Sequence, residues 1–482
     1  MSQLEPQEET LDPADWEAMR ALGHRMVDDA MTWLQSVRER PVWQPVPETV
    51  KAALAVPAPR DPATPESVYA EFTERILPYP MGNVHPRFWG WVMGTGTPFG
   101  VLAEMMAATM NPNCGGADHG ATYVEQQVLD WCKEALGVSA DWSGLLVSGG
   151  SMANLVGLAV ARNARAGTDV RRHGVVGARL TVYASSEAHS SIQKGIELLG
   201  LGTDSLRLIP VDAEYRVNVA ALRAAITADR AAGHRPICII GNAGTVNTGA
   251  FDDLAALADI AAAEDLWFHV DGAFGALAAL VPEYQAPLEA LARADSIAFD
   301  LHKWLYMPFE AGCILVRDAA AHRASFAVTP GYLARATGGL AAGTTWFSDY
   351  GVQLTRGFRA LKIWMSFKEH GLDRYGRLIA QNIEQARYLA ALVDASPELE
   401  RMAPVPLNVV SYRYVGGNTA GKDVDALNRE LLVRIHESGV AVPSSVTLGG
   451  RSGIRVAITN HRSRREDFDL LVSETIRLGR AL

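Results

Sequence analysis

The sequence has few cysteines, no long apolar run and no concentrated positive charge. Its four cysteines, in 482 residues, are widely scattered, and their spacing fits neither a zinc site nor a secreted disulfide framework. No stretch is long and apolar enough to span a bilayer, and the acidic, polar first ten residues do not resemble a signal peptide. We therefore expect reduced thiols, no bound metal, no membrane association and a cytoplasmic location.

The charge balance argues against a general nucleic-acid binder. The net charge is -10, and no basic stripe interleaved with aromatic residues is present. With 48% apolar and 20% charged residues, the chain is expected to fold into a well-packed protein that is too long for a single core. Small molecules are the expected partners.

The order of apolar runs predicts an α/β fold. Between residues 142 and 317, short β-rich runs alternate with helical stretches, as in a mostly parallel sheet with helices on both faces. Further strands near 409–414 and 453–459, with a helix over 465–478, indicate a small α+β domain at the C-terminus. The strands predicted for the large sheet are 145–147, 180–183, 237–241, 266–270, 296–299 and 313–316.

The first part of the chain has the pattern of an arm. Apolar residues recur at helical spacing over 16–37, and the proline-rich segment 41–65 is expected to run extended. Such a helix must bury its apolar face on the large domain or on a second subunit. We predict an N-terminal arm over residues 1–84, a large domain over 85–374 and a small C-terminal domain over 375–482.

A glycine-rich segment follows the first predicted strand and opens a helix. It reads Ser-Gly-Gly-Ser-Met-Ala-Asn over residues 148–154. Open backbone amides at a helix N-terminus, with glycines that allow close approach, suit a phosphate. The segment lacks both the Lys-Ser/Thr ending of a nucleotide loop and the full dinucleotide fingerprint. A phosphate on a smaller cofactor is therefore favoured.

Three further side chains follow separate predicted strands. Lys303 is our candidate for an amine that forms a Schiff base, Asp271 requires a cation if it is buried, and the flat ring of His189 suits a planar ligand. Each has an ordinary alternative: a surface lysine, a turn-capping aspartate or a structural histidine. Together with the phosphate segment, they match the needs of pyridoxal phosphate for an anion site, a planar partner, a countercharge and an amine.

These motifs, with Pro-Val-Trp-Gln-Pro at 41–45 and Phe-Arg-Ala-Leu-Lys-Ile-Trp at 358–364, resemble those of the group II pyridoxal-phosphate-dependent decarboxylases, the family of aromatic-L-amino-acid decarboxylases. The resemblance extends from about Leu22 to the C-terminus. It implies a homodimer of fold-type I, with the arm exchanged between subunits and the active site at their interface. The implied reaction removes CO2 from an L-amino acid, with an aromatic one expected first, and leaves the amine.

Other outcomes remain open on the same fold. An aldehyde synthase, an aminotransferase or an aldolase would use the same cofactor for another reaction. A catalytically silent binding protein would retain only the fold. Intact Lys303, Asp271 and His189 argue against the silent protein.

The resemblance also implies individual roles. Lys303 would bond the cofactor's aldehyde, Asp271 would pair with the ring nitrogen, and His189 would stack on the ring. Ala273 would pack beneath the ring, and Thr245 is a candidate for contact with its hydroxyl. The residues that would hold the phosphate are Ser151, Met152, Ala153 and His302.

Tyr332 lies in a glycine-bounded segment, 331–340, that has the profile of a lid. It matches the family's catalytic-loop tyrosine, which donates the proton after CO2 leaves, and phenylalanine in its place accompanies aldehyde formation. A tyrosine that only anchors the lid is the alternative.

The sequence departs from the family's pattern at several positions. The family's Asn-Pro-His-Lys reads Asp300-Leu301-His302-Lys303 here, and we expect the Asp300 carboxylate to point away from the phosphate. Val246 stands where a second threonine is common. Segments 91–97 and 111–119, which the resemblance suggests line the partner's pocket, are rich in Gly and Asn, so the substrate's side chain is not predicted.

Overall fold

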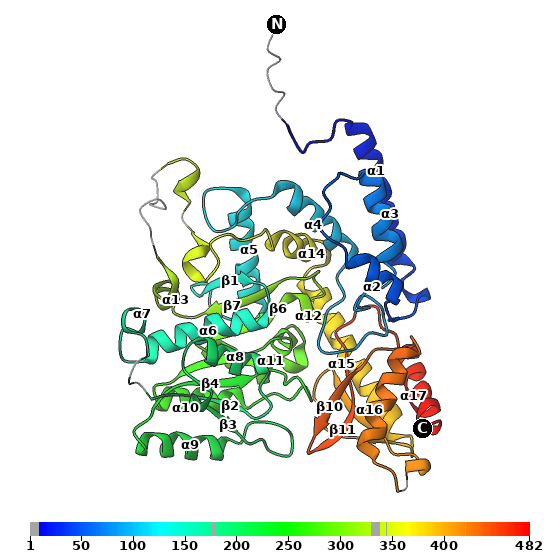
Figure 1. The fold of residues 1–482 in the computed structure, drawn as a ribbon. Coiled ribbons are helices and arrows are strands. Elements are labelled where there is room, and N and C mark those ends of the chain that lie inside the picture. The colour runs from blue at the N-terminus through cyan, green and yellow to red at the C-terminus, as the bar shows by residue number, and fades with distance from the viewer. Residues whose placement is uncertain (1–8, 176, 178, 329–337, 344, 420) are drawn as a thin grey trace.

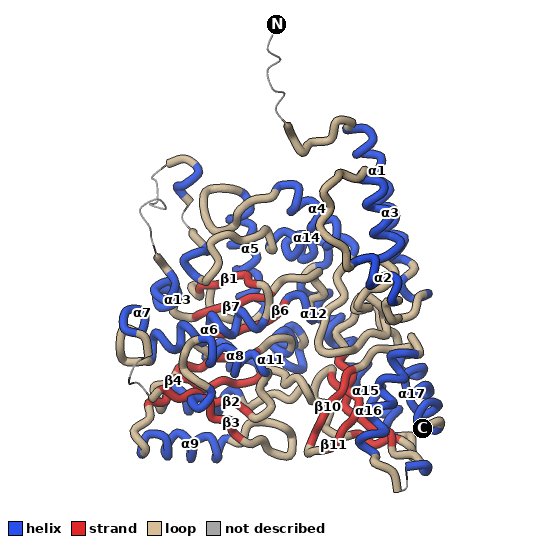
Figure 2. Tube along the Cα trace, viewed as in Figure 1, coloured by secondary structure: helices blue, strands red, loops and turns tan. Residues whose placement is uncertain are grey.

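A seven-stranded sheet forms the centre of the molecule (Figures 1 and 2). The computed structural model describes residues 9–482 except 176, 178, 329–337, 344 and 420. The strand order is β1-β7-β6-β5-β4-β2-β3; β7 is antiparallel to both of its neighbours, and the other pairs are parallel. The strands are β1 Ser143–Val147, β2 Leu180–Ser185, β3 Leu206–Ile209, β4 Arg235–Asn242, β5 Trp267–Asp271, β6 Ser296–Asp300 and β7 Gly312–Val316.

Helices cover both faces of this sheet. Neighbouring residues of a strand point to opposite faces, and on β5 His269 packs against Gly157 of α6, whereas Phe268 lies with Gly241 and Leu254 of α10 on the other face. The predicted α/β class with a mostly parallel sheet is therefore confirmed. Helices between residues 98 and 370 are α4 Pro98–Met110, α5 Gly120–Ala135, α6 Gly150–Arg165, α7 Val170–His173, α8 Ser190–Leu198, α9 Val219–Ala231, α10 Leu254–Ala263, α11 Pro282–Leu288, α12 Leu301–Trp304, α13 Ala319–Phe326 and α14 Ala360–His370.

A smaller antiparallel sheet lies towards the C-terminus, as predicted. Its order is β10-β11-β9-β8, and it packs with three helices around a second cluster of buried residues. The predicted division at residues 374 and 375 remains a prediction, because helix α15 runs across it. The elements are β8 Leu399–Arg401, β9 Val409–Tyr414, β10 Ser444–Leu448, β11 Arg451–Ala457, α15 Leu372–Asp394, α16 Val424–Glu437 and α17 Arg465–Arg480.

The first residues form three helices that stand apart from the large sheet (Figure 1). They are α1 Trp16–Gln35, α2 Glu48–Leu54 and α3 Pro65–Arg75, so α2 interrupts the stretch that we expected to be extended. Asp15 caps α1 by accepting hydrogen bonds from the N–H groups of Glu17 and Ala18. In α1 only Leu22 is buried, and α3 has no buried residue, so most apolar side chains of these two helices are at least partly exposed within the described residues.

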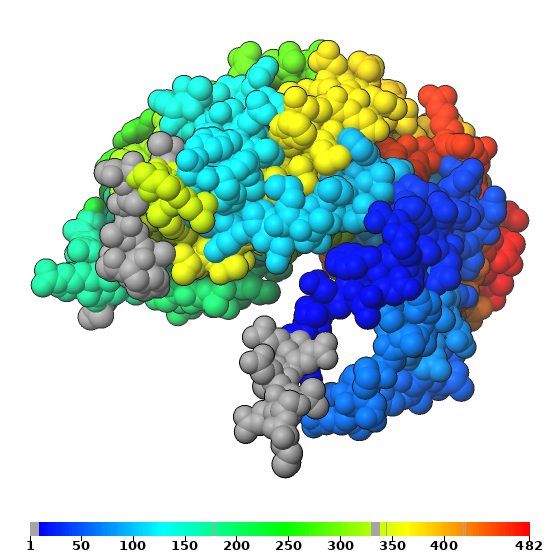
Figure 3. All heavy atoms as spheres, turned by 90° about the horizontal axis from the view of Figure 1, so that it is seen from above, coloured from blue at the N-terminus to red at the C-terminus, as the bar shows by residue number. Residues whose placement is uncertain are grey.

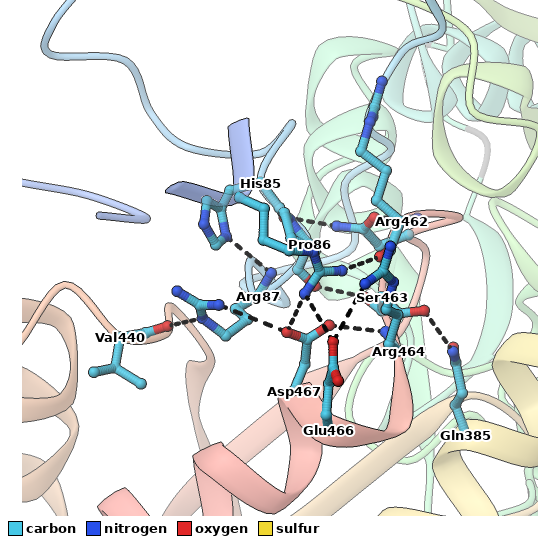
Figure 4. A network of polar contacts seen from close by, with 12 residues as sticks. His85, Pro86, Arg87, Gln385, Val440, Arg462, Ser463, Arg464, Glu466 and Asp467 are labelled. Carbon is cyan, nitrogen blue, oxygen red and sulfur yellow. Dashed lines mark hydrogen bonds and ion pairs between the residues drawn. The ribbon is translucent and has the colours of Figure 1, made fainter. Parts of the chain in front are cut away.

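A polar network joins the arm, and the segment that follows it, to the start of α17 (Figure 4). The Arg38 guanidinium donates to a buried carboxylate, that of Asp467, at 2.7 Å and to the Arg462 carbonyl at 2.8 Å. Arg87 lies 3.6 Å from the same carboxylate, which also accepts a hydrogen bond from the Arg464 N–H. Three segments distant in sequence are thus fixed to one another beside α17.

All four cysteines are buried and unpaired. Within the described residues, no helix is long and apolar enough to cross a membrane.

Candidate active site

The carboxyl ends of several strands open into one cavity of about 340 Å³. Parallel strands place their ends at the same edge of the sheet, where ligands bind in open α/β folds. The cavity brings together predicted residues from four separate segments. It is lined by Ser148, Gly149, Gly150, Ser151, Met152, Asn154, His189, Ser191, Asp271, Ala273, Asp300, His302 and Lys303.

The N-terminus of α6 forms one wall of this cavity. The N–H groups of Met152 and Ala153 already donate to the Gly149 carbonyl, so the open donors of the first turn are those of Gly150 and Ser151. Ala153 itself is fully buried and is not among the residues that line the cavity, so its expected contact with the phosphate stays a prediction. A Cβ on Gly150 would lie 2.8 Å from an Asp300 carboxylate oxygen, so this close approach requires glycine.

His302 presents an uncharged hydrogen-bond donor to the cavity. Its Nδ1 accepts a hydrogen bond from the Ala311 N–H at 3.0 Å, and burial lowers the pKa of the ring. The neutral ring therefore carries its proton on Nε2. This nitrogen lies 3.9 Å from Asp300 Oδ1, on the cavity side.

Asp271 is a buried carboxylate held by uncharged donors. Its Oδ2 accepts from the Asn154 amide at 2.9 Å and its Oδ1 from the Ala273 N–H at 3.2 Å. Burial raises the pKa of Asp271, although the charge of Lys303 and the amide of Asn154 oppose that shift. A cation placed at this carboxylate would therefore stabilise its ionised form.

Asn154 is itself oriented by a buried histidine. His269 Nε2 lies 2.9 Å from Asn154 Oδ1, and its Nδ1 lies 2.7 Å from the hydroxyl of Ser296. Burial lowers the pKa of His269 to about 3, so the ring is neutral and donates through Nε2. This series of hydrogen bonds turns the amide nitrogen of Asn154 towards Asp271. From the sequence, Asn154 was only part of the glycine-rich segment, and we expected no role for it.

A second cavity of about 170 Å³ adjoins the first, with His189, Asp271, Ala273 and Lys303 common to both. His189 caps α8 by accepting from the Ser191 N–H, and burial lowers the pKa of its ring. Thr245 lines the second cavity, but its hydroxyl is paired with that of Thr248 at 2.9 Å. Its other lining residues are Trp91, Val92, Asn242, Gly244, Val246, Phe274 and Arg455.

Arg455, on β11, is a residue of this site that the sequence analysis missed. Its Nη1 donates to the Val246 carbonyl and Asn247 Oδ1, and its Nη2 donates to the hydroxyl of Ser444. Among the described residues, no acceptor pairs with its buried Nε. A guanidinium with open N–H groups suits a carboxylate. The signal available was a charged residue between the apolar residues Ile454 and Val456 of the strand.

Trp91 and Val92 line the cavity of their own chain. The expectation that segment 91–97 lines the partner's pocket stays a prediction. Gly94 explains the placement, because a Cβ there would collide with the carbonyl oxygens of His302 and Lys303. The loop is thus packed directly on the turn that carries the lysine.

Asp300 also differs from our expectation. It is 1% exposed, lines the cavity, and places Oδ2 2.8 Å from the amine of Lys303. The expectation that it points elsewhere was wrong. Tyr332, our predicted proton donor, lies outside the described residues.

The arrangement fits pyridoxal phosphate. The open amides of α6 and His302 Nε2 suit a phosphate, Lys303 offers an amine, and Asp271 is a buried carboxylate whose ionised form a ring cation would stabilise. The Asp300 carboxylate, which lies beside Gly150 at the start of α6, carries a charge that opposes a phosphate there. Fold and site together define a fold-type I pyridoxal-phosphate enzyme.

Comparisons with known proteins give the family. The model of the pyridoxal-dependent decarboxylase conserved domain matches residues 47–415. The chain is 32% identical to an aromatic-L-amino-acid decarboxylase of Bacillus atrophaeus over 94% of its length and 93% of the relative's. It is 29% identical to a phenylacetaldehyde synthase of Arabidopsis thaliana, over 96% and 97%. The Oryza sativa TDC crystallised with PLP and tryptamine superposes with a TM-score of 0.90 at 27% identity, covering 98% of this chain and 99% of that one. The chain belongs to the pyridoxal-dependent decarboxylase family.

Proposed function

We propose that this decarboxylase acts on an aromatic L-amino acid and releases CO2 and the amine. The convergence of Lys303 and Asp271 on one cavity carries the proposal. The names of the relatives and the tryptamine in the rice structure support an aromatic substrate. The second cavity has room for such a side chain beside Trp91 and Phe274.

We propose the following roles for the residues of the site. Pyridoxal phosphate, when bound, supplies a conjugated ring that takes up the electron pair left by departing CO2. Lys303 binds its aldehyde, Asp271 keeps a proton on its ring nitrogen, and His189 covers the ring. The N–H groups of Gly150 and Ser151, with His302 Nε2, hold the phosphate.

The remaining contacts follow from the same cavities. Ala273, which lines both cavities, packs beneath the ring. Thr245 is still the candidate for contact with the ring hydroxyl. Met152 and Ala153 form part of the first turn of α6, which holds the phosphate.

Product analysis tests the reaction. Purified protein loaded with pyridoxal phosphate is expected to release CO2 and amine in equal amounts from one or more of L-tryptophan, L-tyrosine and L-phenylalanine. Aldehyde with hydrogen peroxide would instead identify an aldehyde synthase, which the similarity to a phenylacetaldehyde synthase makes the second candidate. A keto acid would indicate an aminotransferase.

Replacing Tyr332 with phenylalanine is expected to divert products from amine towards aldehyde. The proposal, which rests on the sequence and the family resemblance, is that the phenol protonates the α-carbon after CO2 leaves. Absorbance would show whether the cofactor stays bound, and chromatography would measure the amine-to-aldehyde ratio. Phenylalanine at Tyr350, outside both cavities, is the control. An unchanged amine yield from Tyr332→Phe would refute the assignment.

We propose that a second copy of the chain covers the arm and helix α4, and that the active site lies at that interface. The exposed side of α4 carries Val101, Met105, Met106 and Met110, between 38% and 57% exposed. Helix α4 begins directly after the loop in which Gly94 packs against the backbone of His302 and Lys303. Figure 3 shows the arm projecting from the body beside a hollow.

The assembly is tested by mass. Light scattering is expected to give twice the 52.0 kDa of one chain, and Met106→Glu is expected to produce monomers because it places a charge on the proposed apolar interface. Val433→Glu, at a similarly exposed position on α16, is expected to leave the dimer intact. A dimeric Met106→Glu protein would rule out α4 as the interface.

We further propose a cytoplasmic location. The four buried, unpaired cysteines support it, because reducing compartments keep thiols free. Cell fractionation with a specific antibody would check it, and enrichment in a membrane or secreted fraction would contradict it.

A further inference from the structure

Asp300 lies inside the site that the cofactor's phosphate is expected to occupy. It ends β6, is 1% exposed, and touches the first turn of α6, where a Cβ on Gly150 would come within 2.8 Å of it. Its Oδ1 has no hydrogen-bond partner among the described residues. The carboxylate therefore lies beside the first turn of α6, whose N–H groups suit a phosphate, and its Oδ1 makes no hydrogen bond there.

Little positive charge lies close to Asp300 to offset the charge of its carboxylate. Lys303 is 2.8 Å away, whereas His302 is made neutral by burial and contributes only a dipole. A phosphate monoester carries a charge of about -2 near neutral pH. A phosphate placed at the start of α6 would therefore meet one carboxylate and compete with it for one ammonium group.

We propose that Asp300 acts as a resident anion of the phosphate site. It occupies the amine of Lys303 and repels incoming phosphate, so the site holds phosphate more weakly than it would with an uncharged residue at position 300. Compared with a site that has an uncharged residue at position 300, the native site then retains the cofactor more through Lys303 and Asp271 than through the phosphate. The cofactor also exchanges more readily. This inference rests on the assignment of the cavity to pyridoxal phosphate.

Phosphate binding to the cofactor-free full-length protein tests this idea without measuring activity. Calorimetric titration with inorganic phosphate is expected to show binding at least about tenfold tighter for both Asp300→Asn and Asp300→Ala than for the native chain, because both remove the like charge. Asp295→Asn is the matched control. It changes the net charge equally, just before β6 and outside both cavities, and is expected to leave phosphate affinity unchanged.

A comparison of two ligands separates the phosphate site from the rest of the cavity. Asp300→Asn is expected to slow the release of pyridoxal phosphate by a clearly larger factor than the release of pyridoxal, which lacks the phosphate but bonds the same Lys303 amine. Tighter phosphate binding by Asp300→Asn alone would overturn the proposal, because the gain would then come from a new amide contact. Unchanged or weaker binding in both variants would also overturn it. Product analysis tests the decarboxylase function separately, so the two can fail independently.

Discussion

Lys303→Ala is expected to abolish covalent attachment of the cofactor and to lower kcat on the order of 10⁴-fold or more. Among the described residues, Lys303 is the lysine that lines the cavity. Gly94 packs against the backbone of the turn that carries it. The measurement is borohydride reduction of the holoenzyme followed by peptide mapping. Label is expected on the peptide that contains Lys303, and none is expected in the variant.

Lys133→Ala is the control, because Lys133 is a buried lysine that donates hydrogen bonds to Asp130 and to the Ala140 carbonyl outside both cavities. It is expected to lose stability while keeping the label and most of the activity. Label on any lysine other than Lys303 in the native protein would end the assignment.

The same substitution also tests the ion pair with Asp300. Removing Lys303 leaves a carboxylate that is 1% exposed without its cation, which costs on the order of 3–5 kcal/mol for a buried pair. The double variant Lys303→Ala/Asp300→Asn is therefore expected to recover much of the stability lost by the single variant, but none of its activity. Urea unfolding of the three cofactor-free proteins measures this difference.

The strands that carry the site were predictable because burial leaves a simple pattern. Strands of a parallel sheet covered on both faces read as short continuous apolar runs, and β1, β4, β5, β6 and β7 all do so. The edge strand β3 was missed, since its partial exposure and Arg207, which pairs with Asp229, break the run. The three-residue β8 gave too short a signal.

The direction of side chains at the strand ends was less predictable. Asp271 and Asp300 both end strands, yet only packing shows that Asp300 turns towards Lys303. The room for it comes from Gly150 and Gly312, where a Cβ would lie 2.8 Å from a carboxylate oxygen of Asp300. Gly150 is far from Asp300 in the sequence, and Gly312 lies on the neighbouring strand β7. No local sequence pattern could therefore reveal these contacts. Arg455 reaches the second cavity from the other sheet, and although its charge marks it within β11, only the packing of the two sheets shows which cavity it enters.

Asp271→Ala is expected to lower kcat on the order of 10³-fold while leaving the cofactor-free protein close to its native stability. The activity falls because no carboxylate then keeps the ring nitrogen protonated. The stability is maintained because burial raises the pKa of Asp271, which means that the ionised carboxylate is unfavourable in the cofactor-free fold. Asn154 retains a partner in the hydroxyl of Ser191 at 3.1 Å, and the Ala273 N–H, which also loses its acceptor, belongs to a half-buried residue that lines the cavity.

Asp252→Ala is the control and is expected to lose stability. Burial raises the pKa of Asp252 too, so the two variants differ in the N–H groups that each leaves without an acceptor. The Asp252 carboxylate is equally buried, but it accepts hydrogen bonds from the N–H groups of Val217 and Asn242 and lies outside both cavities. Its loss orphans two buried N–H groups at about 1–3 kcal/mol each, so the protein is expected to unfold at lower urea while its folded fraction turns over normally. Steady-state kinetics and urea unfolding on both variants separate the two roles. Near-normal turnover by Asp271→Ala, with the cofactor bound, would reject its assignment to the ring nitrogen.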